Sequence, residues 1–160
     1  MRSIRCGLQR SHRVYKMVAL VTQLNDHIID CTEVLRQTLG ERVTLSTSLT
    51  RGLRPIHADA SQLRAAIVNI AAHARDVMPG GGRFVIETRN VVVDEHHSDV
   101  RRAEYVQLSL AYAGAGAPLP DLSTASALVE QSGGRITTEI DGGDPSINLY
   151  FPVHAYSAPA

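Results

Sequence analysis

Two different spacings of apolar residues divide the first half of the chain into helix and strand. After Asn25, a residue typical of helix N-caps, apolar side chains recur at spacings of three and four, and Gly40 is placed to end that helix. The apolar stripe consists of Ile28, Ile29, Cys31, Val34, Leu35 and Leu39. Residues 43–49 then alternate between apolar and polar side chains, which predicts a half-buried strand. Residues 54–58 are a candidate for a further short strand after the Arg51-Gly52 turn.

A second helix is predicted from Asp59 onward. Asp59 is followed three residues later by Gln62, which is the spacing of a capping box at a helix start. The apolar stripe behind it consists of Leu63, Ala66, Ile67, Ile70, Ala74 and Val77. Pro79 and the three glycines that follow it predict the end of this helix.

The second half of the chain predicts four strands and one more helix. Residues 83–93 and 105–112 have strand patterns, and residues 135–140 and 147–153 predict a hairpin around the turn Asp141-Gly142-Gly143-Asp144. The helix between them has an apolar stripe and a glycine pair at its end: Leu122, Ala125, Leu128, Val129, Gly133 and Gly134. The whole pattern predicts an α+β fold, a two-layer α/β sandwich with a mixed sheet.

Length, charge and cysteine content exclude several classes of function. The 160 residues suit one domain, and 16 basic against 16 acidic side chains give a formal net charge of zero, so no overall field attracts nucleic acid or acidic lipid. No apolar stretch approaches the roughly 18 to 20 residues that cross a bilayer. Cys6 and Cys31 are far apart in sequence, which predicts reduced thiols rather than a zinc site or a disulfide. We therefore expect a cytoplasmic protein with neither nucleic acid nor membrane as partner.

Two segments carry the most specific pattern in the chain. They are NIAAHARDVMPGGG at residues 69–82 and YVQLSLAYAGAGAP at residues 105–118. Together they resemble the ATP-binding domain of sensor histidine kinases, in the superfamily shared with DNA gyrase and MutL. The resemblance extends roughly from Leu24 to His154. It implies the gyrase-type sandwich, with helices covering one face of the mixed sheet.

The same segments depart from the family's pattern where it contacts ATP. An asparagine of the first segment holds the magnesium in the family, and His73 stands at that position here. An aspartate of the second segment accepts a hydrogen bond from the adenine amino group in the family, and Tyr112 stands there here. The family's lid and its second glycine motif normally follow, whereas residues 118–121 run almost directly into the next predicted helix. The resemblance therefore implies a degenerate domain whose ATP lid is deleted.

The resemblance places the candidate cofactor-binding residues on one helix face and one turn. Asn69, His73 and Asp76 fall within a roughly 60° sector of the predicted helix, because spacings of three and four residues share a face. The full candidate set is Asn69, His73, Asp76, Tyr112, Gly114 and Gly116. Magnesium prefers oxygen ligands, so an imidazole is a poor exchange for an amide oxygen. ATP and magnesium are therefore expected to bind weakly or not at all.

These residues also have ordinary structural explanations. His73 is expected to donate to a nearby carbonyl or to Asp76, with a zinc ligand and a phosphoacceptor as alternatives. The glycines at 80–82 are explained by a sharp turn. Gly114 and Gly116 bring the backbone close to a neighbour, but a short G-x-G pattern is weak evidence for phosphate binding. No catalytic residue and no metal ligand is assigned.

The termini and one loop contain further candidates. Residues 1–24 are interpreted as the remnant of a dimerisation hairpin, too short for the complete hairpin, before an ATPase-like domain at 25–154 and a tail at 155–160. Ser11-His12-Arg13 lacks the acidic neighbour of a phosphoacceptor site. The charged run around His96-His97 is predicted to be a solvated loop rather than a metal site. The N-terminal basic cluster is predicted to be a solvated terminus rather than a nucleic-acid arm.

The functional prediction is a degenerate histidine kinase-like domain in two-component signalling. We expect a non-catalytic binding or regulatory module whose partner is a kinase dimerisation domain or a response regulator. Two alternatives remain: a residual ATP-binding catalytic domain that acts with a separate phosphoacceptor domain, and a truncated kinase without function. The sequence does not determine the oligomeric state.

Overall fold

The computed structural model describes residues 20–21, 23–93, 103–114 and 116–154. The elements in chain order are β1 (Leu20–Val21), α2 (Leu24–Leu39), β2 (Val43–Leu49), β3 (Ala58–Asp59), α3 (Ala60–Val77), β4 (Gly82–Val93), β5 (Ala103–Tyr112), α4 (Ser123–Gln131), β6 (Arg135–Asp141) and β7 (Asp144–Pro152). No helix in these ranges is long and apolar enough to cross a membrane.

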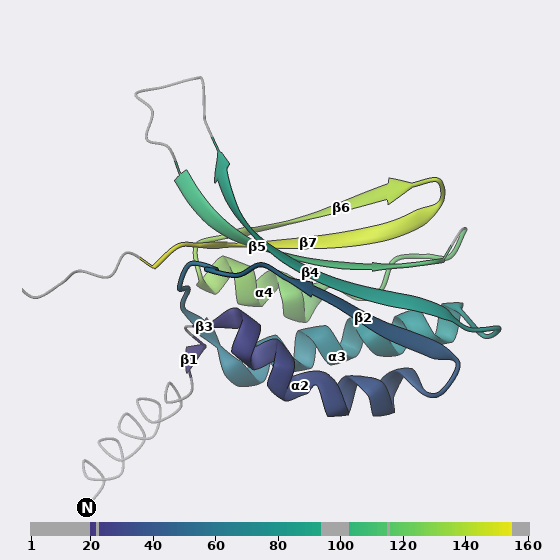
Figure 1. The fold of residues 1–160 in the computed structure, drawn as a ribbon. Coiled ribbons are helices and arrows are strands. Elements are labelled where there is room, and N and C mark those ends of the chain that lie inside the picture. The colour runs from purple at the N-terminus through teal and green to yellow at the C-terminus, as the bar shows by residue number, and fades with distance from the viewer. Residues whose placement is uncertain (1–19, 22, 94–102, 115, 155–160) are drawn as a thin grey trace, which may run out of the picture.

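Five strands form one mixed sheet in the order β2-β4-β5-β7-β6. The β2–β4 pair is parallel and the other three neighbouring pairs are antiparallel. β1 and β3 form a separate antiparallel pair. Helices α2, α3 and α4 lie together on one face of the sheet (Figure 1). This arrangement confirms the predicted α+β two-layer sandwich.

The core lies between the three helices and every second residue of the central strands. Strand residues alternate between the two faces of a sheet, so one set faces the helices and is fully buried. That set comprises Phe84, Ile86, Val106, Leu108, Leu110, Ile147, Leu149 and Phe151. Helix α3 contributes Leu63, Ile67 and Ile70, which the sequence predicted as its apolar stripe. The orientation of α3 about its own axis is thereby set by its packing on the sheet.

The start of α2 is stabilised differently from the sequence prediction. The helix begins at Leu24 with Gln23 as its N-cap, so the prediction that Asn25 caps it is wrong. Asn25 lies inside the helix, where its Nδ2 donates to the Thr50 carbonyl at 2.8 Å and its Oδ1 accepts from Thr88 Oγ1 at 2.8 Å. Thr88 is buried and needs such a partner. The asparagine therefore ties α2 to the residue that follows β2 and to the middle of β4.

The short strand expected at residues 54–58 is wrong in position. The pairing begins only at Ala58, and Ala58 and Asp59 pair with Val21 and Leu20 of β1. Periodicity could not place this strand, because two residues are too few to show an alternating pattern.

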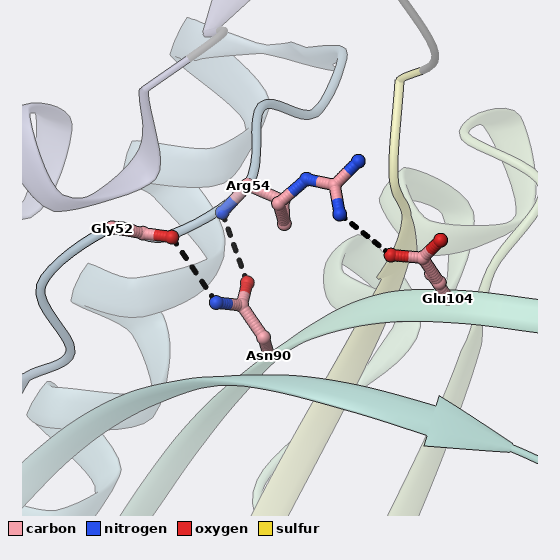
Figure 2. A network of polar contacts seen from close by, with 4 residues as sticks. All are labelled: Gly52, Arg54, Asn90 and Glu104. Carbon is pink, nitrogen blue, oxygen red and sulfur yellow. Dashed lines mark hydrogen bonds and ion pairs between the residues drawn. The ribbon is translucent and has the colours of Figure 1, made fainter.

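The residues before β3 cross the end of the sheet and are held there by side chains (Figure 2). Asn90 of β4 donates to the Gly52 carbonyl at 3.1 Å and accepts from the Arg54 amide at 2.9 Å. The Arg54 guanidinium pairs with Glu104 of β5 at 2.7 Å. Both charged side chains are about half exposed, so the ion pair contributes little, whereas the Asn90 amide satisfies two backbone groups.

Helix α3 begins as its sequence predicts. The Asp59 carboxylate accepts hydrogen bonds from the backbone amides of Ser61 at 3.0 Å and Gln62 at 3.2 Å. These bonds satisfy two of the amides that a helix start leaves without partners. The helix ends at Val77, immediately before the Pro79 segment that was expected to stop it.

Replacing Asp59 with Ala should lower the free energy of unfolding by about 1 kcal/mol at neutral pH. Hydrogen bonds from Ser61 and Gln62 hold the pKa of Asp59 below its usual value. The carboxylate's contribution is therefore present above the ordinary aspartate pKa of about 3.9 and is lost as the pH falls through the lower pKa of the folded state. Urea unfolding of both proteins between neutral pH and about pH 3 measures the difference.

The matched control is Asp59→Asn, which keeps an acceptor oxygen and cannot titrate. A stability difference between wild type and Asp59→Ala that stays constant throughout the acid range would contradict the carboxylate cap.

Candidate functional site

Asn69 and His73 lie one turn apart on α3 and bind the same neighbouring segment. Asn69 Nδ2 donates to the Asp121 carbonyl at 3.0 Å, and His73 Nε2 lies 2.8 Å from the Pro118 carbonyl. A carbonyl oxygen can only accept, so His73 Nε2 carries the proton of this bond. The expectation that His73 donates to a nearby carbonyl is confirmed.

The segment that receives these bonds joins β5 to α4, and we call residues 116–122 the β5–α4 connection. The Ala117 amide donates to the Gly114 carbonyl at 2.9 Å, which makes a tight turn, and Gly116 has φ +79°. The Asp121 carboxylate accepts from the Ser123 amide at 3.0 Å, and hydrogen bonding to Ser123 lowers the pKa of Asp121. Pro120 is buried. The connection is therefore anchored at Ala117, Pro118, Pro120 and Asp121.

Tyr112, the last residue of β5, fills the space beside these α3 side chains. Its ring centroid lies 6.1 Å from that of His73, edge to face, and 6.2 Å from that of Phe84, nearly parallel. The residue is only 3% exposed, and its hydroxyl has no hydrogen-bond partner among the described residues. Burial raises the pKa of Tyr112 to about 12. The phenol is therefore neutral at physiological pH and carries no charge for a ligand.

Gly114 is a position of close approach. Its amide donates to the Asp144 carboxylate at 3.3 Å. A methyl group added at Gly114 would lie 3.3 Å from both Tyr112 Cε2 and Val77 Cγ2. The groups that lie close to Gly114 are therefore side chains of this protein. Gly116 differs, because its positive φ favours glycine while the space around it is open.

Asp76 does not join the other two residues of the predicted strip. Its carboxylate accepts from Arg75 Nε at 3.1 Å and Nη2 at 3.0 Å, and its side chain is 66% exposed. It lines a cavity of about 530 Å³ at the ends of α2 and α3, together with residues such as Arg42 and Pro79. The helix therefore brings Asn69 and His73 to the β5–α4 connection and leaves Asp76 outside it.

The glycines after α3 form a turn, as expected. Gly81 has φ +97°, its amide donates to the Met78 carbonyl, and a methyl group there would lie 2.6 Å from the Arg42 carbonyl. The next amide, that of Gly82, donates to the same Arg42 carbonyl at 3.2 Å. Backbone geometry alone explains why glycine is needed here.

The other metal-ligating side chains that the sequence offered form no metal site within the described ranges. Residues 20–21, 23–93, 103–114 and 116–154 contain no group of three or more His, Cys, Asp or Glu side chains that could hold a metal ion. Cys31 is a buried thiol whose pKa is raised by burial. Cys6, His12, His96 and His97 lie outside the described residues.

Sequence reasoning missed the groups that complete the site. The carbonyls of Pro118 and Asp121 accept the α3 hydrogen bonds, and Asp144 binds the Gly114 amide from β7. Backbone carbonyls have no signature in a sequence, and Asp144 was assigned only to a hairpin turn. The prolines at 118 and 120 were the available signal, because they fix the backbone of a short connection.

Comparisons with known proteins agree on the fold. No protein-family model matches the chain. Sensor kinase CckA of Brucella abortus (strain 2308) is 33% identical over 102 residues, which cover 61% of this chain but only 11% of that kinase. The mycobacterial sensor histidine kinase MprB superposes with a TM-score of 0.63 at 16% identity, covering 85% of this chain and 99% of that one.

Histidine kinase ThkA in complex with response regulator protein TrrA superposes with a TM-score of 0.57 at 15% identity, covering 96% of this chain and 48% of the matched chain. Together with the sequence match, these superpositions show the fold of histidine kinase catalytic domains. The chain spans about a tenth of the length of CckA, its curated relative.

Replacing Tyr112 with Phe should raise the free energy of unfolding by about 1 kcal/mol, because it removes a buried hydroxyl that has no partner in the described part of the chain. Urea unfolding at neutral pH measures the change. Tyr105→Phe is the matched control, since Tyr105 is only half-buried and faces the other side of the sheet. A clear loss of stability in Tyr112→Phe would mean that the hydroxyl is satisfied.

Proposed function

We propose that this domain is a non-catalytic binding or regulatory module of two-component signalling. The observation that supports the proposal is that Asn69 and His73 form hydrogen bonds within the domain. In the resembled family this face of the helix lines the nucleotide pocket, and here both side chains bond to the chain's own β5–α4 connection. A nucleotide would have to displace that connection before it could reach them.

The side chains at this site do not fit a magnesium ion. His73 offers a nitrogen instead of the oxygen that magnesium prefers, and its Nε2 is bonded to the Pro118 carbonyl. Asp76, the nearest carboxylate on the helix, is paired with Arg75 and lines a different cavity. No phosphoryl transfer step is therefore assigned to these residues.

The position of the family's adenine-binding acid is also changed. Tyr112 is buried and neutral, so it cannot supply the charged acceptor that an aspartate would give. The loss of a hydrogen bond to a charged group corresponds to roughly 1.5 to 3 kcal/mol, or about ten- to two-hundredfold in affinity. Its ring also packs between His73 and Phe84, in space that a base would need.

The missing lid adds a third obstacle. β5 ends at Tyr112 and α4 begins at Ser123, and the connection between them is anchored by α3. Phosphoryl transfer depends on held phosphates and an ordered closure that excludes water. This connection is too short and too firmly bound to provide that closure.

The proposed partner is a kinase dimerisation domain or a response regulator. ThkA, a histidine kinase of the same fold, forms a complex with response regulator protein TrrA, which supports this choice. A folded domain that has lost its nucleotide contacts keeps its surface for protein binding. Purified kinase hairpins and response regulators from the same organism are the direct test, and failure of all of them to bind would contradict the proposal.

The second candidate function is a residual ATP-binding catalytic domain that acts with a separate phosphoacceptor domain. Gly116 favours it, because a glycine with positive φ beside open space leaves room for a phosphate to approach the backbone. This function requires ATP hydrolysis or phosphate transfer that falls when Asn69 is replaced by Ala. A truncated kinase without function would give neither catalysis nor partner binding.

Calorimetric titration with a non-hydrolysable ATP analogue, with and without magnesium, tests the proposal. The wild-type domain should show no binding at a Kd below about 100 micromolar, which corresponds to roughly 5.5 kcal/mol. The double variant Tyr112→Asp, His73→Asn restores the family's residues and should bind more tightly than wild type. Binding of the analogue by the wild type with a lower Kd would instead support the catalytic alternative.

A further inference from the structure

The β5–α4 connection is held by two side chains that α3 presents as a rigid pair. Asn69 and His73 are four residues apart, so they lie on the same helix face, one turn apart. The carbonyls that they bind belong to Asp121 and Pro118, which are three residues apart in the connection. Two bonds from one rigid helix to one short segment fix both its position and its direction.

The connection itself has few ways to move away from α3. Pro118 and Pro120 each restrict a backbone torsion, and Pro120 is buried. At one end the Ala117 amide closes a turn onto Gly114, and at the other the Asp121 carboxylate accepts from the amide of Ser123, the first residue of α4. Opening the segment therefore requires mainly that the two α3 bonds break.

An unsatisfied polar group lies next to this segment. The Tyr112 hydroxyl is buried without a partner among the described residues, its ring packs edge to face with that of His73, and a methyl group added at Gly114 would lie 3.3 Å from it. An unpartnered buried hydroxyl favours any opening that lets water reach it. A closed position of the connection therefore needs bonds that hold it against this tendency.

We propose that the β5–α4 connection is an intramolecular lock, held closed against α3 by Asn69 and His73, so that the domain stays ordered at this edge without any nucleotide. The lock deepens the proposed non-catalytic function and rests on it, because it gives Asn69 and His73 a purpose that excludes a ligand. The two hydrogen bonds are cooperative in this lock. Each bond holds the connection in the position in which the second bond can form.

Amide hydrogen exchange measured by NMR tests the lock. The double variant Asn69→Leu, His73→Phe keeps the size of both side chains and removes both donors. The Ala117 amide, which bonds within the turn, should exchange roughly ten- to one-hundredfold faster than in wild type, because the loss of two hydrogen bonds favours the open form by about that factor. Each single variant should show part of this effect.

Two comparisons keep the result specific. The Gly134 amide at the end of α4 donates to the Val129 carbonyl, away from the connection, and should exchange at the wild-type rate in all variants. Arg75→Ala is the matched control, since it removes another bond from an α3 side chain to a carbonyl, that of Thr38, and should leave Ala117 exchange unchanged. Unchanged Ala117 exchange in a folded double variant, or equal acceleration in Arg75→Ala, would overturn the lock.

The lock and the proposed function fail in different experiments. Binding of the ATP analogue by the wild-type domain would contradict the non-catalytic function. Exchange at Ala117 reports only whether Asn69 and His73 hold the connection and is measured without nucleotide.

Discussion

The packing of α3 on the sheet determines where the candidate residues of that helix lie. The helix buries Leu63, Ile67 and Ile70 completely, so its rotation about its own axis is fixed by the core. Asn69 and His73 then necessarily lie at the border of that core, facing the end of β5. The site is a consequence of hydrophobic packing, and its chemistry follows from which side chains stand at that border.

Most of the fold was predictable from the sequence, because it rests on periodic burial. The strand predicted at residues 43–49 has the same bounds as β2, and the other long strands and the helices were predicted to within a few residues. The errors concern features without periodicity. Asn25 has the residue type of a cap but is needed by buried Thr88, and β3 is too short to show an alternating pattern.

The candidate site was predictable only in part. Helical spacing correctly placed Asn69 and His73 side by side, but it gave Asp76 the same role. Asp76 shares that face but lies near the end of α3, where Arg75 binds its carboxylate and where it lines a cavity with Pro79. The sequence could not predict the hydrogen-bond acceptors of Asn69 and His73. Every residue has a backbone carbonyl, and the direction of each carbonyl depends on the fold of the connection.

On the proposed function, the lock and the changed residues oppose nucleotide binding independently, so their effects multiply. Two neutral hydrogen bonds are together worth about 1 to 3 kcal/mol, which keeps the open form at roughly a sixth to under one hundredth of the population. The apparent affinity for any ligand that needs the open form falls by the same factor. The missing acid at Tyr112 lowers it by a further ten- to two-hundredfold. The same bonds order the edge beside α4 without a ligand. A protein partner therefore meets a preformed surface, and binding does not have to supply the free energy that closes the β5–α4 connection.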